Sequence, residues 1–154
     1  NSFFLKKKYK LICFGGEKFT YEEKFLFSKL GIKENFSQEF GDEECLKKFY
    51  KKANLFVTTS LEEGFGLTNL EAMSSGCPVL CSDIPIFREI LGDSCEYVNP
   101  KSIESIKNKM EKILKSQNEQ KRLIRLGLDK VKNYSWDKCA SSTSKIYKRL
   151  ISEK

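Results

Sequence analysis

The fold of this chain is decided by the stretch Glu63-Gly64-Phe65-Gly66-Leu67-Thr68-Asn69-Leu70-Glu71-Ala72-Met73. It lies between two apolar runs, at 55–57 and 78–80. Its glycines stand directly before a segment with the pattern of a helix start, which predicts strand, glycine loop, helix, turn and strand. In such a unit the loop lies at the carboxyl end of a strand, where open α/β sheets bind phosphorylated ligands.

Strand and helix patterns alternate along the rest of the chain. Strands are predicted at 9–14, 35–40, 54–60, 78–82 and 95–98, the first of them buried. Helices are predicted at 20–30, 42–53, from 85 to 90, and at 102–115, 118–133 and 136–152, and residues 1–8 resemble the last turns of another. The helix at 102–115 is expected to turn its apolar side, which includes Ile103, toward the core.

Short connections between alternating strands and helices favour a parallel sheet with helices on both faces. The predicted fold class is therefore α/β, a Rossmann-like parallel sheet followed by C-terminal helices. A length of 154 residues suggests one domain, so residues 1–154 are taken as a single unit.

The composition is that of a globular protein, with 40% hydrophobic and 32% charged residues. No run reaches the ~18 apolar residues of a membrane span, and no signal-peptide pattern is present. The net charge of +7 comes mainly from dispersed lysines, which favour a solvated surface over nucleic-acid binding. Lys107, Lys109, Lys112 and Lys115 are expected to line a solvated helix surface; the alternative is a basic face toward an anionic membrane or acidic substrate.

The chain has six cysteines, no Cys-x-x-Cys pair and no histidine. This composition disfavours a zinc site and removes any Ser-His or Cys-His catalytic pair from within the chain. Cysteines such as Cys77 and Cys81 lie in or beside apolar runs, where they act as small apolar side chains. Reduced thiols in a cytoplasmic protein are therefore expected, and no metal site is predicted.

The glycine loop has the features of an anion site. Gly64 and Gly66 allow a sharp turn and close approach of a ligand. The backbone amides of Gly66, Leu67 and Thr68 would be the unpaired donors of a helix start, which favour a phosphate or diphosphate. Phe65 is expected to pack beneath the loop.

Two carboxylates flank this loop and require a different partner. Glu63 would repel a phosphate, so neutral hydroxyls suit it better, and Glu71 is placed so that it can point back toward the loop. A carboxylate that accepts hydrogen bonds from two vicinal hydroxyls suits a ribose. One ligand with a sugar, a diphosphate and a ribose in that order, a nucleotide-sugar, would occupy the whole stretch. The alternative is that Glu63 is a surface residue and Glu71 a solubilising helix residue.

The stretch from Glu63 to Glu71, with seven residues between the two glutamates, is also the basis of a family resemblance. With the segments Gly76-Cys77-Pro78-Val79 and Ser82-Asp83-Ile84-Pro85, it resembles the retaining glycosyltransferases of family 4, or group 1, which share a Glu-x7-Glu pattern and the two-domain GT-B fold. Flanking segments at 14–16, 40–44 and 134–136 fall where the family has counterparts. The segment from Ile84 to Asp93 is similar to mannosyl and related polysaccharide transferases of that group.

The resemblance implies a role for each matching position. Glu63, the catalytic candidate, would contact the hydroxyls of the donor sugar. The Gly64-Phe65-Gly66-Leu67-Thr68 segment would hold the diphosphate, and Glu71 would bind the ribose. Gly15, Gly16 and Phe40 would border the base. The family generally works without a metal, so no cofactor is implied.

The chain departs from the family pattern at its beginning. The family has an Arg and a Lys that neutralise the departing diphosphate, and nothing here matches them or the acceptor-binding domain. The chain thus resembles an N-terminally truncated, donor-binding half of an enzyme. That enzyme would transfer a sugar with retention from a UDP- or GDP-sugar to an acceptor hydroxyl, which the missing domain would bind. The isolated chain is expected to be inactive and to bind nucleotide weakly.

The implied setting is polysaccharide, lipopolysaccharide, capsule or glycolipid synthesis, in the cytoplasm or at the inner face of the membrane. A lipid-linked acceptor and peripheral membrane contact would fit the parent enzyme. Three alternatives stay open from the sequence. They are another GT-B enzyme, such as a nucleotide-sugar epimerase or a phosphorylase-like protein, a non-catalytic basic binding module, and a plain nucleotide-binding scaffold.

Overall fold

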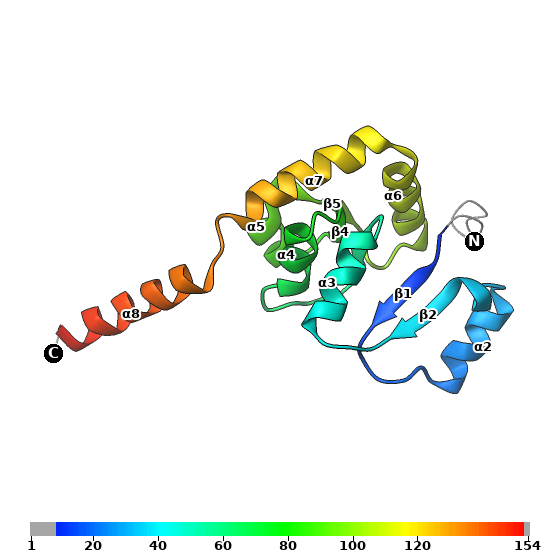
Figure 1. The fold of residues 1–154 in the computed structure, drawn as a ribbon, viewed down its shortest axis with the longest axis horizontal. Coiled ribbons are helices and arrows are strands. Elements are labelled where there is room, and N and C mark those ends of the chain that lie inside the picture. The colour runs from blue at the N-terminus through cyan, green and yellow to red at the C-terminus, as the bar shows by residue number, and fades with distance from the viewer. Residues whose placement is uncertain (1–8, 153–154) are drawn as a thin grey trace.

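The structure, a computed structural model, describes residues 9–152, so the helix predicted at 1–8 lies outside the described residues. Strands and helices alternate in the first part of the chain and helices follow (Figure 1). The elements are β1 (Leu11–Phe14), α2 (Tyr21–Lys29), β2 (Phe36–Glu39), α3 (Glu43–Lys52), β3 (Phe56–Thr58), α4 (Leu67–Ser74), β4 (Val79–Ser82), α5 (Pro85–Leu91), β5 (Glu96–Val98), α6 (Ile103–Lys115), α7 (Gln117–Val131) and α8 (Trp136–Ser152). Short 3₁₀ helices occupy Lys33–Asn35 and Gly92–Ser94.

Local sequence explains where these helices begin. Thr20 and Glu23 form a reciprocal capping box at the start of α2. The Asp42 carboxylate accepts a hydrogen bond from the Cys45 amide at 2.8 Å and caps α3. Pro85 occupies the first turn of α5, where its missing N–H has no cost.

All strand pairs in the described residues are parallel, as the alternating pattern predicts. They do not form one sheet, however. β1 pairs with β2 in a two-stranded sheet, and β3, β4 and β5 form a second sheet in that order. The α/β fold class is confirmed, and the division into two sheets is a feature that the sequence pattern did not reveal.

The core lies around β4, α4, α5 and α7. β4 is buried along its whole length, and Met73 of α4 and Phe87 of α5 are 1% and 0% exposed. Gly127 of α7 lets that helix approach α4 closely, because a Cβ there would lie 3.0 Å from the Met73 Cγ atom. The three-stranded sheet and its helices therefore form the rigid base of the central glycine loop.

The two-stranded part is less buried than the sequence suggests. Leu11 is 50% exposed and Ile12 43%, so the prediction of a buried first strand is wrong. The apolar side of α2 is also exposed. A sheet of two strands is too narrow to cover a helix face, which explains both results.

The C-terminal helices are placed as predicted, with one exception in burial. Ile103 is 80% exposed at the first turn of α6, so its predicted inward position is wrong, whereas Ile113 and Leu114 are buried. α8 extends away from the rest of the molecule (Figure 1) and has no buried residue among those described.

Candidate functional site

The central loop leaves the carboxyl end of β3 and turns into α4 at Gly66. This residue has φ +85° and ψ +45°, a left-handed conformation that costs an L-residue about 1–2 kcal/mol. A Cβ at this position would also lie 2.5 Å from the Cε1 atom of the buried Phe87 ring. Glycine is thus required for two reasons: the backbone is left-handed here, and the Phe87 ring leaves no room for a Cβ. Gly64, by contrast, has no positive φ, and a Cβ there would meet no atom within 4 Å.

Asn69 fixes the first turn of α4 against β3. Its side chain is fully buried, and its Oδ1 atom accepts a hydrogen bond from the Thr58 hydroxyl at 3.0 Å. Its backbone N–H donates to the Gly66 carbonyl at 3.1 Å. The Nδ2 atom of Asn69 is buried and has no hydrogen-bond partner among the described residues. Sequence reasoning assigned no role to Asn69, because an amide on a helix usually faces solvent.

The start of α4 is open to solvent. Leu67 is 47% exposed, and Thr68 and Glu63 are exposed as well. Thr68 and Leu67 occupy the first two helical positions, whose amides have no acceptor within the helix. Among the described residues Glu63 makes no hydrogen bond or ion pair with another side chain. The loop therefore presents donors and a free carboxylate side by side.

Glu71 is exposed on α4 and has a neighbour that the sequence interpretation missed. The pKa of Tyr50 on α3 is raised, mainly because the residue is buried. The Glu71 carboxylate beside its hydroxyl is the next cause. Tyr50 was assigned only to the apolar side of its helix, and it is indeed 6% exposed. The same shift shows that the Tyr50 hydroxyl lies near the Glu71 carboxylate.

Phe65 contacts one aromatic side chain but is more exposed than a residue packed beneath the loop would be. Its ring lies edge-on to the ring of Tyr134, with 5.9 Å between the centroids, and remains 38% exposed. The Tyr134 hydroxyl in turn donates to the Ile90 carbonyl at 2.8 Å. The segment before α8 thus supports the loop from below, a role that no local sequence pattern indicated.

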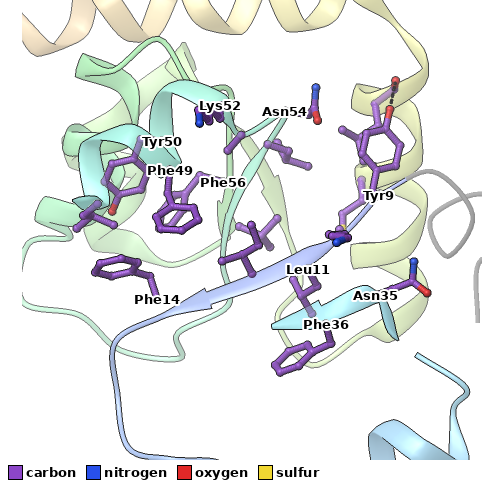
Figure 2. Close-up of a pocket in the computed structure, with 18 of the residues that line it drawn as sticks. Tyr9, Leu11, Phe14, Asn35, Phe36, Phe49, Tyr50, Lys52, Asn54 and Phe56 are labelled. Carbon is purple, nitrogen blue, oxygen red and sulfur yellow. Dashed lines mark hydrogen bonds between the residues drawn. The ribbon is translucent and has the colours of Figure 1, made fainter. Parts of the chain in front are cut away.

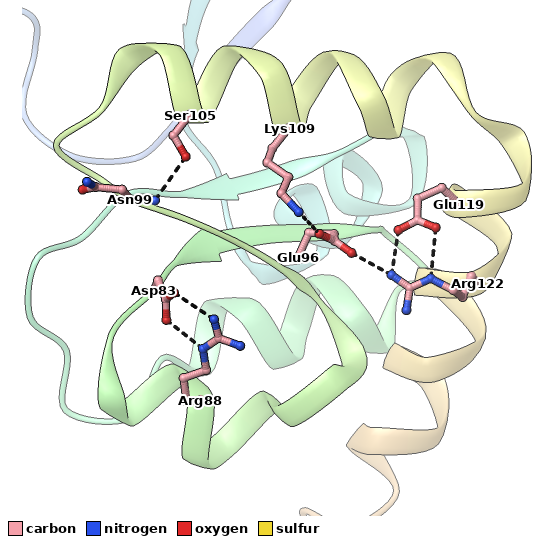
Figure 3. A network of polar contacts seen from close by, with 8 residues as sticks. All are labelled: Asp83, Arg88, Glu96, Asn99, Ser105, Lys109, Glu119 and Arg122. Carbon is pink, nitrogen blue, oxygen red and sulfur yellow. Dashed lines mark hydrogen bonds and ion pairs between the residues drawn. The ribbon is translucent and has the colours of Figure 1, made fainter.

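A second polar group follows the carboxyl end of β4 (Figure 3). Arg88 donates two hydrogen bonds to the Asp83 carboxylate, at 2.7 and 2.8 Å, and its guanidinium lies 3.8 Å from the centre of the Tyr97 ring. These hydrogen bonds lower the pKa of Asp83. Asp83, which the sequence left unassigned, is thus held by Arg88.

Gly15, Gly16 and Phe40 follow β1 and β2, the strands of the other sheet. Both glycines have φ +75° with open space around them, and Phe40 is 55% exposed. The Gly15 amide donates to the Glu39 carbonyl at 2.9 Å, which joins the ends of the two strands.

A cavity lies apart from most of the predicted site residues. It has a volume of about 720 Å³ and is lined by β1, β3, α3 and α6 (Figure 2). Of the predicted site residues only Thr68 reaches it. The candidate site is thus an open loop surface and not this cavity.

The C-terminal helices are joined by a charged network around Glu96 of β5 (Figure 3). Glu96 pairs with Lys109 of α6 and, at 2.8 Å, with Arg122 of α7, which also pairs with Glu119. Lys107 and Lys115 form ion pairs within α6 as well. Much of the charge on α6 is therefore balanced, which gives no support to a free basic face on this helix.

The cysteines form no disulfide among the described residues, and the possible metal ligands there form no cluster. All six thiols are free, and the Sγ atoms of Cys81 and Cys95 lie 3.5 Å apart in the core. Within residues 9–152, no three His, Cys, Asp or Glu side chains are grouped to hold a metal ion. Across the same residues no helix has the length and apolar character needed to cross a membrane.

Comparison with known proteins shows the family of this chain. The family model of the glycosyl transferases group 1 matches residues 4–128. The chain belongs to the group 1 glycosyl transferases. An O-antigen chain mannosyltransferase B from Escherichia coli is 31% identical over 94% of this chain, but the chain spans only 39% of that relative's length.

Solved structures agree with this family fold. A sucrose-phosphate synthase from Thermosynechococcus elongatus matches 94% of the chain with a TM-score of 0.84 and 22% identity, and this match covers 39% of the synthase. The Anabaena protein HepE, solved in complex with UDP, matches 94% of the chain with a TM-score of 0.75 and 16% identity, and 41% of HepE is covered. The fold of this group 1 chain therefore matches one part of each of these longer proteins.

Proposed function

We propose that this chain is the donor-binding part of a glycosyltransferase that moves a sugar from a nucleotide-diphosphate sugar to an acceptor hydroxyl, with retention of configuration. The observation that carries the proposal is the Gly66 turn, which opens the amides of α4 at the carboxyl end of a parallel strand between two exposed glutamates. Membership of the group 1 family supports the reaction class. The mannosyltransferase relative supports a role in the synthesis of a surface polysaccharide.

The roles of the site residues follow from their chemistry. The amides of Gly66, Leu67 and Thr68 hold the diphosphate, because a helix start favours an anion. Glu63 accepts hydrogen bonds from the hydroxyls of the donor sugar. Glu71 accepts them from the ribose, with the Tyr50 hydroxyl near its carboxylate.

The remaining assignments belong to the same proposal. Gly64 and Phe65 shape the loop, while Gly15, Gly16 and Phe40 border the base. The donor is a UDP- or GDP-sugar, no metal takes part, and the reaction occurs at the cytoplasmic side of the membrane. Residues 1–154 alone are expected to show no turnover, because the chain spans only 39% of the length of its mannosyltransferase relative.

Calorimetric titration with UDP, GDP, UDP-glucose and GDP-mannose tests the proposal. Glu71→Gln is expected to weaken nucleotide binding by about tenfold or more, because a hydrogen bond to a charged group contributes about 1.5–3 kcal/mol. Glu62→Gln, at an exposed neighbouring glutamate, is the matched control and should leave the affinity unchanged. Equal affinities for the wild type and Glu71→Gln would contradict the ribose assignment, and turnover of GDP-mannose by this chain would contradict its inactivity.

A further inference from the structure

Three polar side chains lie at the base of the central glycine loop. Thr58 is the last residue of β3, Asn69 lies in the first turn of α4, and Ser82 is the last residue of β4. Asn69 and Ser82 are both 0% exposed, and Thr58 is half-buried. Burying a polar side chain costs free energy unless its hydrogen bonds are made. Which of these polar atoms are paired therefore decides what the group can do.

Asn69 joins the two ends of this loop. The loop, residues 59–66, runs from the end of β3 to the start of α4. The Thr58 hydroxyl donates to Asn69 Oδ1 at 3.0 Å, so the residue before the loop is hydrogen-bonded to the helix that follows it. The backbone N–H of Asn69 also donates to the Gly66 carbonyl at 3.1 Å. Asn69 therefore fixes both ends of the loop.

The donor of the Asn69 side-chain amide is unpaired. Its Nδ2 atom is buried and has no hydrogen-bond partner among the described residues. It faces the Gly66 turn, since it lies 3.1 Å from the point that a Cβ on Gly66 would occupy. The Phe87 ring borders the same point and carries no oxygen or nitrogen that could accept this bond. An unpaired buried donor costs free energy, and an acceptor that comes within reach removes this cost.

The backbone of the loop carries unpaired acceptors. Among the described residues, no carbonyl of residues 59–65 accepts a hydrogen bond and no amide of this segment donates one. Residues 61–65 are also exposed. The segment is thus held at its two ends and by the contact of the Phe65 ring with Tyr134. Such a backbone can rearrange without breaking hydrogen bonds, and its carbonyls are suitable acceptors for the Asn69 donor.

We propose that Asn69 is a positioning residue of the donor site. When a diphosphate binds at the start of α4, the loop closes over it and a main-chain carbonyl of residues 59–65 accepts a hydrogen bond from Asn69 Nδ2. The closed loop holds Glu63 against the donor, and the Thr58 hydroxyl keeps the Asn69 amide in the required orientation. A ligand oxygen is the less suitable acceptor, because Nδ2 is buried. This inference rests on the proposed donor function, to which it adds a residue and a loop closure.

Nuclear magnetic resonance of the isotope-labelled full chain tests this directly. The chain is titrated to saturation with GDP-mannose or UDP-glucose, and the side-chain amide protons of Asn69 are followed. One of these protons should move downfield and exchange with water at least about tenfold more slowly, because it gains an acceptor. A coupling across the hydrogen bond should join Nδ2 to a carbonyl carbon of residues 59–65. The exposed side-chain amide of Asn118 on α7 is the control and should not change.

Variants measure what the Asn69 amide contributes to binding. Asn69→Ala should weaken donor binding by about three- to tenfold, the loss expected for one neutral hydrogen bond. Thr58→Val should weaken it as well, and the double variant should bind no more weakly than Asn69→Ala, because Thr58 acts through Asn69. Ser94→Ala removes another buried hydroxyl, which donates to the Leu91 carbonyl at 2.6 Å, and is the matched control. It should lower the thermal stability but change donor affinity by less than about twofold.

The possible results separate this inference from the proposed function. No binding of either nucleotide-sugar by the wild type would overturn both. Binding without a change at the Asn69 amide, or with a coupling from Nδ2 to phosphorus, would overturn the loop closure alone. Equal weakening by Asn69→Ala and Ser94→Ala would overturn the positioning role, as would additive losses from Thr58→Val and Asn69→Ala. The spectra of the wild type need no variant, so the test stands even where Asn69→Ala does not fold.

Discussion

The Gly66 turn allows the sharpest prediction on this chain. Gly66→Ala must hold alanine at φ +85°, which costs about 1–2 kcal/mol. The new Cβ would lie 2.5 Å from the Phe87 Cε1 atom and 3.1 Å from the Asn69 Nδ2 atom. Phe87 is 0% exposed, so its ring has little room to move, and overpacking of this kind costs about 1–3 kcal/mol. The expected loss in the free energy of unfolding is therefore about 2–5 kcal/mol.

Two other glycines around α4 separate these contributions. Gly76, just after α4, has φ +75° and open space within 4 Å, so Gly76→Ala should lose only the conformational part, about 1–2 kcal/mol. Gly64 has neither a positive φ nor a close neighbour, so Gly64→Ala should change stability by less than about 1 kcal/mol. Urea unfolding followed by circular dichroism gives all three values on one scale.

The order of the three losses is decisive. The structure requires Gly66→Ala to exceed Gly76→Ala, and Gly76→Ala to exceed Gly64→Ala. Equal losses at Gly66 and Gly76 would show that the Phe87 ring moves aside at no cost. The close packing of Gly66 against Phe87 would then be wrong. A large loss at Gly64 would show that the loop has a different conformation.

Three further predictions concern charged and titrating groups. The raised pKa of Tyr50 means that its hydroxyl holds the proton more tightly in the folded chain than in the unfolded chain, where the pKa is about 10. Its contribution to stability is therefore fully present below about pH 10 and is lost as the pH rises further. Tyr50→Phe should flatten this alkaline loss in unfolding experiments, and Glu71→Gln should lower the Tyr50 pKa measured by tyrosinate absorbance. Glu96→Gln should cost about 1–3 kcal/mol in thermal unfolding, because its side chain is 17% exposed between two cations. Glu104→Gln, in a more exposed pair, should cost clearly less. The lowered pKa of Asp83 means that its stabilisation is lost as pH falls through that pKa, and Asp83→Asn should cost at most about 1 kcal/mol, less at high salt.

Local patterns were sufficient to predict the elements and the turn of the site. The N-caps at Thr20 and Asp42, the proline that opens α5 and the glycine before α4 each depend on residues a few positions apart. The sequence therefore contained the order of the strands and helices and the open start of α4. It also contained the parallel direction of the strands, because short αβ connections allow no other.

Features that depend on distant residues were not predictable in this way. The break between β1 and β3 is a matter of which strand edges meet, and no periodicity reports that. Asn69 resembles a surface amide until β3 brings Thr58 to its side chain. Tyr50 has the spacing of an apolar helix face, and only the fold places its hydroxyl near Glu71. The functional details of the site thus come from contacts between α3, β3 and α4.

The charge around the loop limits how strongly it can hold a diphosphate. Residues 58–76 contain three glutamates and no lysine or arginine. A bound diphosphate would therefore rely on the amides and dipole of α4, and a helix terminus contributes only about 0.3–1 kcal/mol per favourable charge at an exposed site. Arg88, which follows the next strand, is already paired with Asp83. Strong diphosphate binding thus requires cations from outside residues 58–76.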